Sequence, residues 1–440
     1  MRSPHQLLGL ALICVCAAPA ATLQYPEADL PELASLLEQA REKAPVLVAQ
    51  GLAQQESTAR LAAAKGAYYP RFDLGGQFGL TRTTYTDGSL KDENRMGLGF
   101  GASVTRPLYH WGAIEATIQQ ARLDFKNEEL QRVFLLRQIK RSLRADYLTL
   151  LVNQETLQAL RLRRQITADG IARSQADKDQ GAVSALAAEQ ADLALSQGLI
   201  DIEQVEAEQT RILADYKRTL GWDAPLALDK PVPNPDPAAV IAWAAQTRAS
   251  GLDGWLNDNS EVLRRQNLVA REREELIKVK AGQRPQLNLT GSVIQEQRNT
   301  AAKNNVEAVS YFVGIGMTWN VFDGFATAAK KRETLLRERR LERQLEAYRA
   351  ELRAQSVVVV TQIGFIARQL QIDQRRAELS TQSFSTQQTE AKEGRIAPQA
   401  FRGVQLAHHE TQQAVSRTRV RLLLAINDYL DLTLPASVNL

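Results

Sequence analysis

The side chains that most often carry catalysis or bind metal ions are few in this chain. The histidines are His5, His110, His408 and His409, and the cysteines are Cys14 and Cys16. Adjacent residues of a helix project about 100° apart, so the histidine pair is poorly placed to share one metal ion. Neither an HExxH zinc motif nor a GxSxG nucleophile motif occurs. We therefore predict that the chain is not an enzyme and holds no metal and no cofactor.

Two further signals are also weak. Gly97, Gly99 and Gly101 resemble a phosphate-binding loop, but the Lys-Ser/Thr ending of such loops is missing. Their spacing fits the small-residue face of a strand better. The chain carries 54 basic and 50 acidic side chains, and a net charge of +4 is too small to indicate a nucleic-acid partner.

Proline spacing predicts very long helices. None of the 15 prolines lies between Pro107 and Pro225, and none lies between Pro285 and Pro398. We expect long helices over 113–179 and 326–392, each roughly 100 Å long at about 1.5 Å per residue. Returning helices are expected over 182–220 and 397–432. Leucines at seven-residue intervals, such as Leu136 and Leu143, indicate coiled-coil packing of these antiparallel hairpins.

Four short segments alternate between apolar and polar residues. They form two predicted hairpins, at about 69–107 and about 285–322, with polar loops between their strands. Strands of about ten residues are long enough to cross a membrane. Soluble sandwich strands have the same period, so this alternative stays open. Four strands cannot close a membrane barrel, and several protomers would have to share one.

The two halves of the chain repeat each other. Thr105 to Ala113 aligns without gaps on Thr318 to Ala326, and the same offset takes Gly181 to Gly394. We therefore divide the chain into a first repeat (21–221), a proline-rich linker (222–258), a second repeat (259–434) and a short tail (435–440).

Residues 1–20 have the features of an export signal. Arg2 precedes the apolar stretch from Leu7 to Cys16, and Ala18 and Ala20 give the small residues that signal peptidase prefers. Cleavage there would remove both cysteines, and lipidation of the N-terminus stays open. Beyond this segment no apolar run reaches 18 residues, so no transmembrane helix is predicted.

Four short motifs, in the order of the repeat, resemble those of the TolC family of outer-membrane efflux proteins. Two are similar to the family's strand–helix junctions and run from Pro107 to Gly112 and from Val321 through Asp323 to Gly324. The other two are similar to its helix-tip turns, and their residues are Gly181, Ala182, Val183 and Ser184, and Gly394, Arg395, Ile396 and Ala397.

The resemblance covers nearly the whole chain and implies a mostly α fold with a small β part. In it, long helical hairpins form an α-barrel, and four strands per protomer complete a 12-stranded barrel in a homotrimer. It also implies a location in the outer membrane of a Gram-negative bacterium, among its lipids, with a large periplasmic part. The implied partners are a periplasmic adaptor (membrane fusion) protein, which would contact the helix tips, and an inner-membrane transporter.

One expected site departs from the family pattern. Some members carry acidic residues six and nine positions after the second tip glycine, where this chain has Ala400 and Gly403, with Arg402 beside them. These three residues are the candidate aperture, an acidic ring is not supported, and the ion selectivity stays open.

Two functions compete at this point. The first is the passive, gated outer-membrane channel of a tripartite export system, for efflux or type I secretion. The second is a soluble periplasmic coiled-coil scaffold that binds other proteins. Four membrane-length strands favour the channel, whereas the sequence distinguishes neither the exported substrate nor the class of pump.

Overall fold

The structure is a computed structural model of the 440-residue chain. It describes residues 23–84, 93–178, 185–223, 226, 228, 230–250, 254–300 and 303–436. The chain divides into two compact units. The helical unit comprises Met1–Ala44, Gln138–Trp255 and Arg353–Leu434, and the sheet unit comprises Pro45–Arg137, Leu256–Leu352 and Pro435–Leu440.

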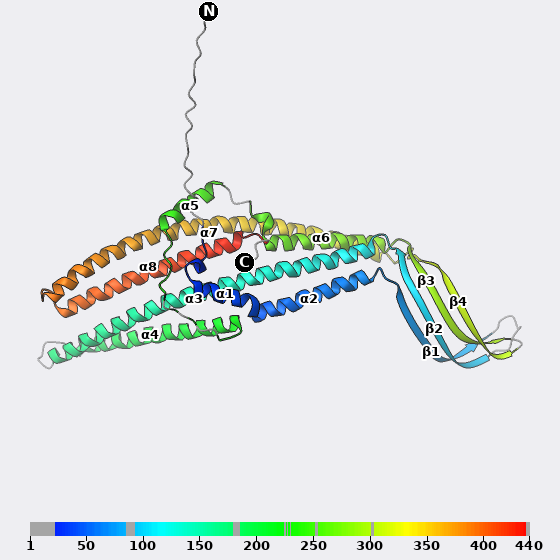
Figure 1. Cartoon of the computed structure of the whole chain (residues 1–440), viewed down its shortest axis with the longest axis horizontal. Helices are drawn as coiled ribbons and strands as arrows, with labels where there is room; N and C mark the ends of the chain where they lie inside the picture. The colour runs from blue at the N-terminus through cyan, green and yellow to red at the C-terminus, as the bar shows by residue number, and fades with distance from the viewer. Residues whose placement is uncertain are drawn as a thin grey trace, which may run out of the picture. The chain divides into compact units, whose positions relative to one another are not determined.

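The sheet unit contains all the described strands. They are β1 (Arg71–Thr83), β2 (Glu93–Tyr109), β3 (Gln286–Thr300) and β4 (Lys303–Thr318). The strands form one antiparallel sheet in chain order, and they lie side by side in Figure 1. α2 (Pro45–Gly66) leads into β1, and α6 (Ser260–Ala281) leads into β3. The first parts of α3 (Ala113–Lys178) and α7 (Ala326–Lys392) and the short η2 (Leu256–Asp258) complete this unit.

The helical unit contains the remaining parts of α3 and α7 and the helices that return from them. The returning helices are α4 (Ala185–Leu220) and α8 (Pro398–Thr433). Three smaller elements complete the unit: η1 (Pro26–Ala28), α1 (Pro31–Lys43) and α5 (Pro237–Ser250). The predicted fold class, mostly helical with a small antiparallel sheet, is confirmed.

The elements repeat at two offsets along the chain. Adding 213 to both ends of α4 (Ala185–Leu220) gives α8 (Pro398–Thr433), and adding 215 to both ends of α2 (Pro45–Gly66) gives α6 (Ser260–Ala281). The same hydrophobic pattern therefore folds into the same element twice. None of the described helices has an apolar stretch that could cross a membrane.

The sheet has one apolar and one polar face. Register pairs Phe72 with Val104 and Leu74 with Ala102, so the apolar residues of neighbouring strands share a face. This face is open, because Leu74 is 89% and Val313 is 83% exposed. A face of this kind needs a cover or an apolar solvent, since burying apolar surface is worth roughly 25 cal/mol per Å².

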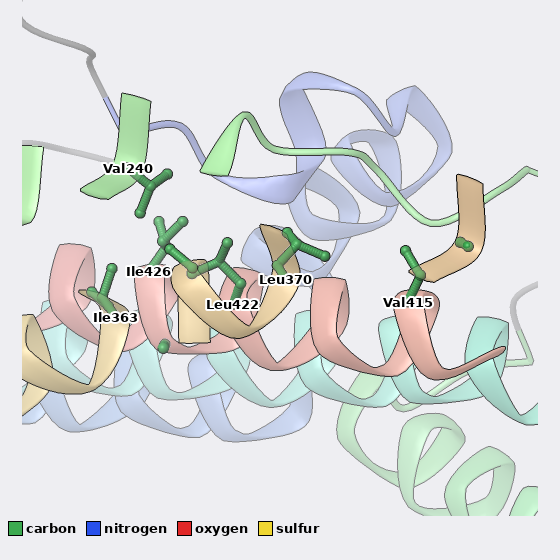
Figure 2. Close-up of a cluster of buried hydrophobic side chains, with 9 residues drawn as sticks. Val240, Ile363, Leu370, Val415, Leu422 and Ile426 are labelled. Atoms are coloured by element: carbon green, nitrogen blue, oxygen red, sulfur yellow. The ribbon is translucent and has the colours of Figure 1, made fainter. Parts of the chain in front are cut away.

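The core of the helical unit joins α5, α7 and α8 (Figure 2). Its residues are Val240, Ile363, Ala367, Leu370, Ala377, Val415, Leu422, Ala425 and Ile426. Gly364 keeps α7 close to α5, because an added Cβ would lie 3.4 Å from the Arg248 Nη2 and 3.6 Å from the Ala244 Cβ. This core fixes the part of the α7–α8 hairpin that lies away from its turn.

Candidate functional site

The turn between α7 and α8 is a Schellman motif at Gly394. Gly394 has φ +75°, its N–H donates to the Ala391 carbonyl at 3.1 Å, and the Arg395 N–H donates to the Glu390 carbonyl at 2.9 Å. Glycine is favoured here because a side chain strains a left-handed backbone. The structure thus places a tight turn at the second predicted tip.

The rest of this tip is short and largely open to solvent. Ala397 is the N-cap of α8 and provides no side-chain cap, while Pro398 occupies the first helical position. Arg395 is exposed and pairs with Glu393 at 2.6 Å, and Ile396 is half-buried. The corresponding first tip, Gly181 to Ser184, lies outside the described residues, so its adaptor contact stays a prediction.

The candidate aperture residues lie in the first turns of α8. Ala400 and Gly403 are exposed, and an added Cβ at Gly403 would meet no atom within 4 Å. Arg402 is different, because its guanidinium forms an ion pair with Asp169 of α3. Farther along α8, Glu410 forms an ion pair with Arg163, also of α3.

These two ion pairs tie α8 to α3. The sequence singled out Arg402 but missed Asp169, Arg163 and Glu410, because the partners lie more than 200 residues apart in the chain. Charge alternation on long helices gives no signal for which residues pair. All four side chains are partly exposed, and ion pairs of this kind are typically worth about 0–1 kcal/mol. They can therefore break and re-form at little energetic cost.

The histidine pair belongs to an aromatic stack in the α7–α8 hairpin. The Phe384 ring lies between those of Phe401 (centroids 5.6 Å apart) and His408 (4.9 Å), and both neighbours are stacked. Burial, with a smaller contribution from the charge of His409, lowers the pKa of His408. Among the described residues no group of His, Cys, Asp and Glu could hold a metal ion. His408 therefore serves packing in this structure.

The first strand–helix junction follows a β-bulge. The register of β2 against β3 shifts between Pro107 and Tyr109. Two consecutive residues then adopt left-handed backbone, Trp111 with φ 54° and Gly112 with φ 82°. The Trp111 Nε1 donates to the Pro285 carbonyl at 2.8 Å, and the Arg284 guanidinium lies 4.7 Å from its ring. These contacts hold a tryptophan in a conformation that costs roughly 1–2 kcal/mol.

The second junction repeats this backbone with the glycine shifted by one residue. Gly324 has φ 64° and Phe325 has φ 68°, so both copies place two left-handed residues before the long helix. The Asp323 carboxylate accepts hydrogen bonds from the Thr327 hydroxyl and, at 2.8 Å, from the Thr327 N–H. These hydrogen bonds lower the pKa of Asp323 and cap the start of α7. The sequence identified the glycines and missed the second left-handed residue.

A buried arginine in the helical unit was not predicted from the sequence. Arg144 of α3 is fully buried and donates to the Glu27 carboxylate at 2.9 and 2.5 Å. It also donates to the Asn427 Oδ1 at 2.8 Å, and its guanidinium lies 3.9 Å from the Tyr25 ring. Burial raises the pKa of Tyr25, and the charge of Asp431 raises it further. This cluster anchors the segment before α1 to α3 and α8.

Comparison with known proteins gives a family match over part of the chain and a shared fold over nearly all of it. Residues 36–221 match the model of the family described as outer membrane efflux protein. The fold matches the CmeC outer membrane channel of Campylobacter jejuni with a TM-score of 0.75, at 12% identity, over 100% of this chain and 95% of that one.

Two more solved structures have the same fold. The outer-membrane protein VceC of Vibrio cholerae matches with a TM-score of 0.70 at 12% identity, over 94% of this chain and 98% of that one. The outer-membrane channel OprN matches with a TM-score of 0.72 at 15% identity, over 94% of each chain. No curated protein sequence gives a significant match.

The matched segment and the fold are both similar to those of outer-membrane channels. The resemblance to the TolC family of outer-membrane efflux proteins, inferred from the four motifs, is confirmed. Residues 36–221 are similar to that family and the chain has the fold of solved outer-membrane channels, which favours a channel over a soluble coiled-coil scaffold.

Proposed function

We propose that this chain forms a homotrimeric, passive export conduit in the outer membrane of a Gram-negative bacterium, with its helices in the periplasm. One observation carries the proposal. The sheet order is β1-β2-β3-β4, so β1 and β4 are edge strands without a further strand partner in the described part of the chain. Each unpaired backbone group in a membrane costs on the order of several kcal/mol. A sheet with open edges is therefore not stable in a membrane.

Neighbouring copies can satisfy these edges by pairing β1 of one chain with β4 of the next. Three copies of a four-stranded sheet give a 12-stranded barrel, whose exposed apolar face would contact lipid. A two-copy barrel would have only eight strands, and barrels of that size leave an interior filled by side chains. A trimer leaves more room for a solute, which favours it for export.

Gating would occur at the α7–α8 tip. The ion pairs Arg402–Asp169 and Arg163–Glu410 hold α8 against α3 in this structure. Breaking them would free the tip while the apolar core around Leu422 keeps the base of the hairpin in place. The conduit then changes between closed and open states without bond chemistry.

Energy and substrate choice would come from partners. We infer an inner-membrane transporter and a periplasmic adaptor, and we place the adaptor contact at the two helix tips, Gly181 to Ser184 and Gly394 to Ala397. A short turn at the end of a long hairpin, with exposed Arg395 and Glu393, offers a polar surface that an adaptor could bind.

Assembly can be tested by crosslinking the two edge strands. The only cysteines of the chain, Cys14 and Cys16, lie in the predicted signal, so the exported protein provides a cysteine-free background. Gly75→Cys on β1 and Ser310→Cys on β4 are combined and treated with a short bis-maleimide in native membranes. We expect covalent dimers and trimers, whereas either cysteine alone gives no trimer. A product that stays monomeric would refute the shared barrel.

Gating can be tested by single-channel recording in planar bilayers. We expect Arg402→Asp to raise the open probability, because it replaces an attraction to Asp169 by a repulsion. Combining it with Asp169→Arg restores the pair in reverse and should return the closed state. If the single variants conduct like the wild type, this ion pair is no part of the gate.

A further inference from the structure

One charged side chain lies on the apolar face of the sheet. On β2, Phe100, Ala102, Val104 and Arg106 alternate with small or polar residues, which puts Arg106 on the face exposed to lipid in the proposed barrel. Among the described side chains of the four strands, it is the only charged one on this face. Arg106 is exposed, and no described residue forms an ion pair with it.

Apolar residues surround Arg106 in the sheet. The register places Arg106 opposite Leu289 of β3, and Leu289 opposite Ile315 of β4. The bulge after Pro107 brings Tyr109 opposite Leu287, in the next row toward the helices. The chain therefore presents a cation in an apolar row that is bordered by an aromatic side chain.

A similar arginine on the other face of the sheet has an acidic partner. Arg71 of β1 is exposed on the polar face and pairs with Asp73 at 2.8 Å, two residues along the same strand. Arg106 has no acidic residue at the corresponding place, because position 108 is a leucine. No acidic side chain among the described residues neutralises its charge, which leaves Arg106 available to a group outside the chain.

The chemistry of the surroundings identifies that group. An unpaired arginine facing lipid is costly near the middle of a membrane and nearly neutral at its interface. The long side chain can extend toward the interface, where its planar guanidinium binds a phosphate through two hydrogen bonds. The neighbouring Leu289 and Ile315 would contact the acyl chains of the same molecule.

We propose that Arg106 binds the phosphate of a glycerophospholipid at the periplasmic border of the barrel, one lipid per chain. The proposal rests on the proposed function, because it requires the apolar face to be in a membrane. It adds a lipid-binding residue that fixes the depth of the barrel at the end nearest the helices.

Native mass spectrometry of the purified, delipidated protein tests this proposal with phosphatidylglycerol as the probe. We compare the wild type with Arg106→Gln and with the matched control Arg71→Gln, and size-exclusion chromatography checks that each variant stays assembled. We expect one tightly bound lipid per chain in the wild type and in the control. In Arg106→Gln this lipid should bind at least tenfold more weakly, because a charge-assisted hydrogen bond is lost. Arg106→Lys should recover part of the affinity.

Several outcomes would overturn the proposal. Equal lipid binding in the wild type and Arg106→Gln would do so, as would an equal loss in Arg71→Gln, which would indicate a general effect of charge. Displacement of the tightly bound lipid by millimolar glycerol 3-phosphate would show an anion site without acyl-chain contacts. If wild-type trimers conduct in bilayers but Arg106 does not affect lipid binding, only this inference fails. If the wild type neither assembles nor inserts, the proposed function fails as well.

Discussion

Arg144 is the buried charge on which we expect the packing of the helical unit to depend most. It is fully buried and donates to the carboxylate of Glu27 and to the side chain of Asn427. We consider Arg144→Met, which keeps most of the side-chain volume and removes the charge. Removing one partner of a buried ion pair typically costs about 3–5 kcal/mol, because the other charge stays buried without compensation.

The structure places this variant at the lower end of that range. The Glu27 side chain is 21% exposed, so water can partly solvate its carboxylate after the change. We therefore expect a loss of about 3 kcal/mol, which corresponds to a roughly hundredfold change in an opening equilibrium. A large chain with two units is not expected to unfold in one step, so a local measurement is needed.

Hydrogen exchange of the purified protein, read by mass spectrometry, provides that measurement. Amides of α8 around Asn427 should exchange roughly a hundredfold faster in Arg144→Met than in the wild type. The matched control is Arg343→Met, whose side chain is 84% exposed and pairs with Glu346 at 2.9 Å. An exposed pair is worth about 0–1 kcal/mol, so the control should change exchange near position 343 by fivefold or less.

One outcome would contradict a stabilising role of the buried Arg144 cluster. If Arg144→Met accelerates exchange near Asn427 no more than Arg343→Met does near its own position, the buried cluster does not stabilise the helical unit.

Further predictions follow from local geometry. Gly112→Ala should destabilise the first junction by about 1–2 kcal/mol, because Gly112 has φ +82°. Gly51→Ala should stabilise α2 by about 0.5–1 kcal/mol, because an added Cβ there meets no atom within 4 Å. Shifts of the melting temperature in opposite directions would check both predictions. Leu422→Ala should cost about 2–5 kcal/mol, measured as faster exchange in α8, because this side chain is fully buried in the core. The pKa of His408 is lower in the folded protein than in the unfolded protein, so the unfolded protein binds the proton more readily. The contribution of His408 to stability is therefore complete above about pH 6.5 and is lost as the pH falls below that value. Exchange in the hairpin, corrected for the intrinsic pH dependence, should therefore increase at pH 5 in the wild type and not in His408→Phe, and an equal increase in both would contradict this account.

Much of the fold could be predicted because its patterns are local and repeated. The absence of proline between Pro107 and Pro225 permits a long helix, and α3 extends without interruption from Ala113 to Lys178. Alternating residues gave the strands, since the two faces of a strand have a period of two. The tip glycine at Gly394 was found because a left-handed turn position favours glycine.

The contacts of the candidate site could not be predicted in this way. Arg402 was expected at the aperture, but its ion pair with Asp169 joins residues more than 200 positions apart. Trp111 gives no sign in the sequence of its left-handed backbone, which depends on its hydrogen bond to the Pro285 carbonyl. In both cases the partner comes from a distant segment that only folding brings near.

The kind and the order of the elements follow from local features, because hydrophobic period, proline spacing and turn glycines act over a few residues. Which charges meet depends on how distant segments pack. The tertiary structure buried Arg144 against Glu27 and Asn427, and it left Arg106 on an apolar face without an acidic partner among the described residues. The physical reason is that an ion pair depends on distances between side chains in space, and a sequence fixes those distances only through the packing of whole helices and strands.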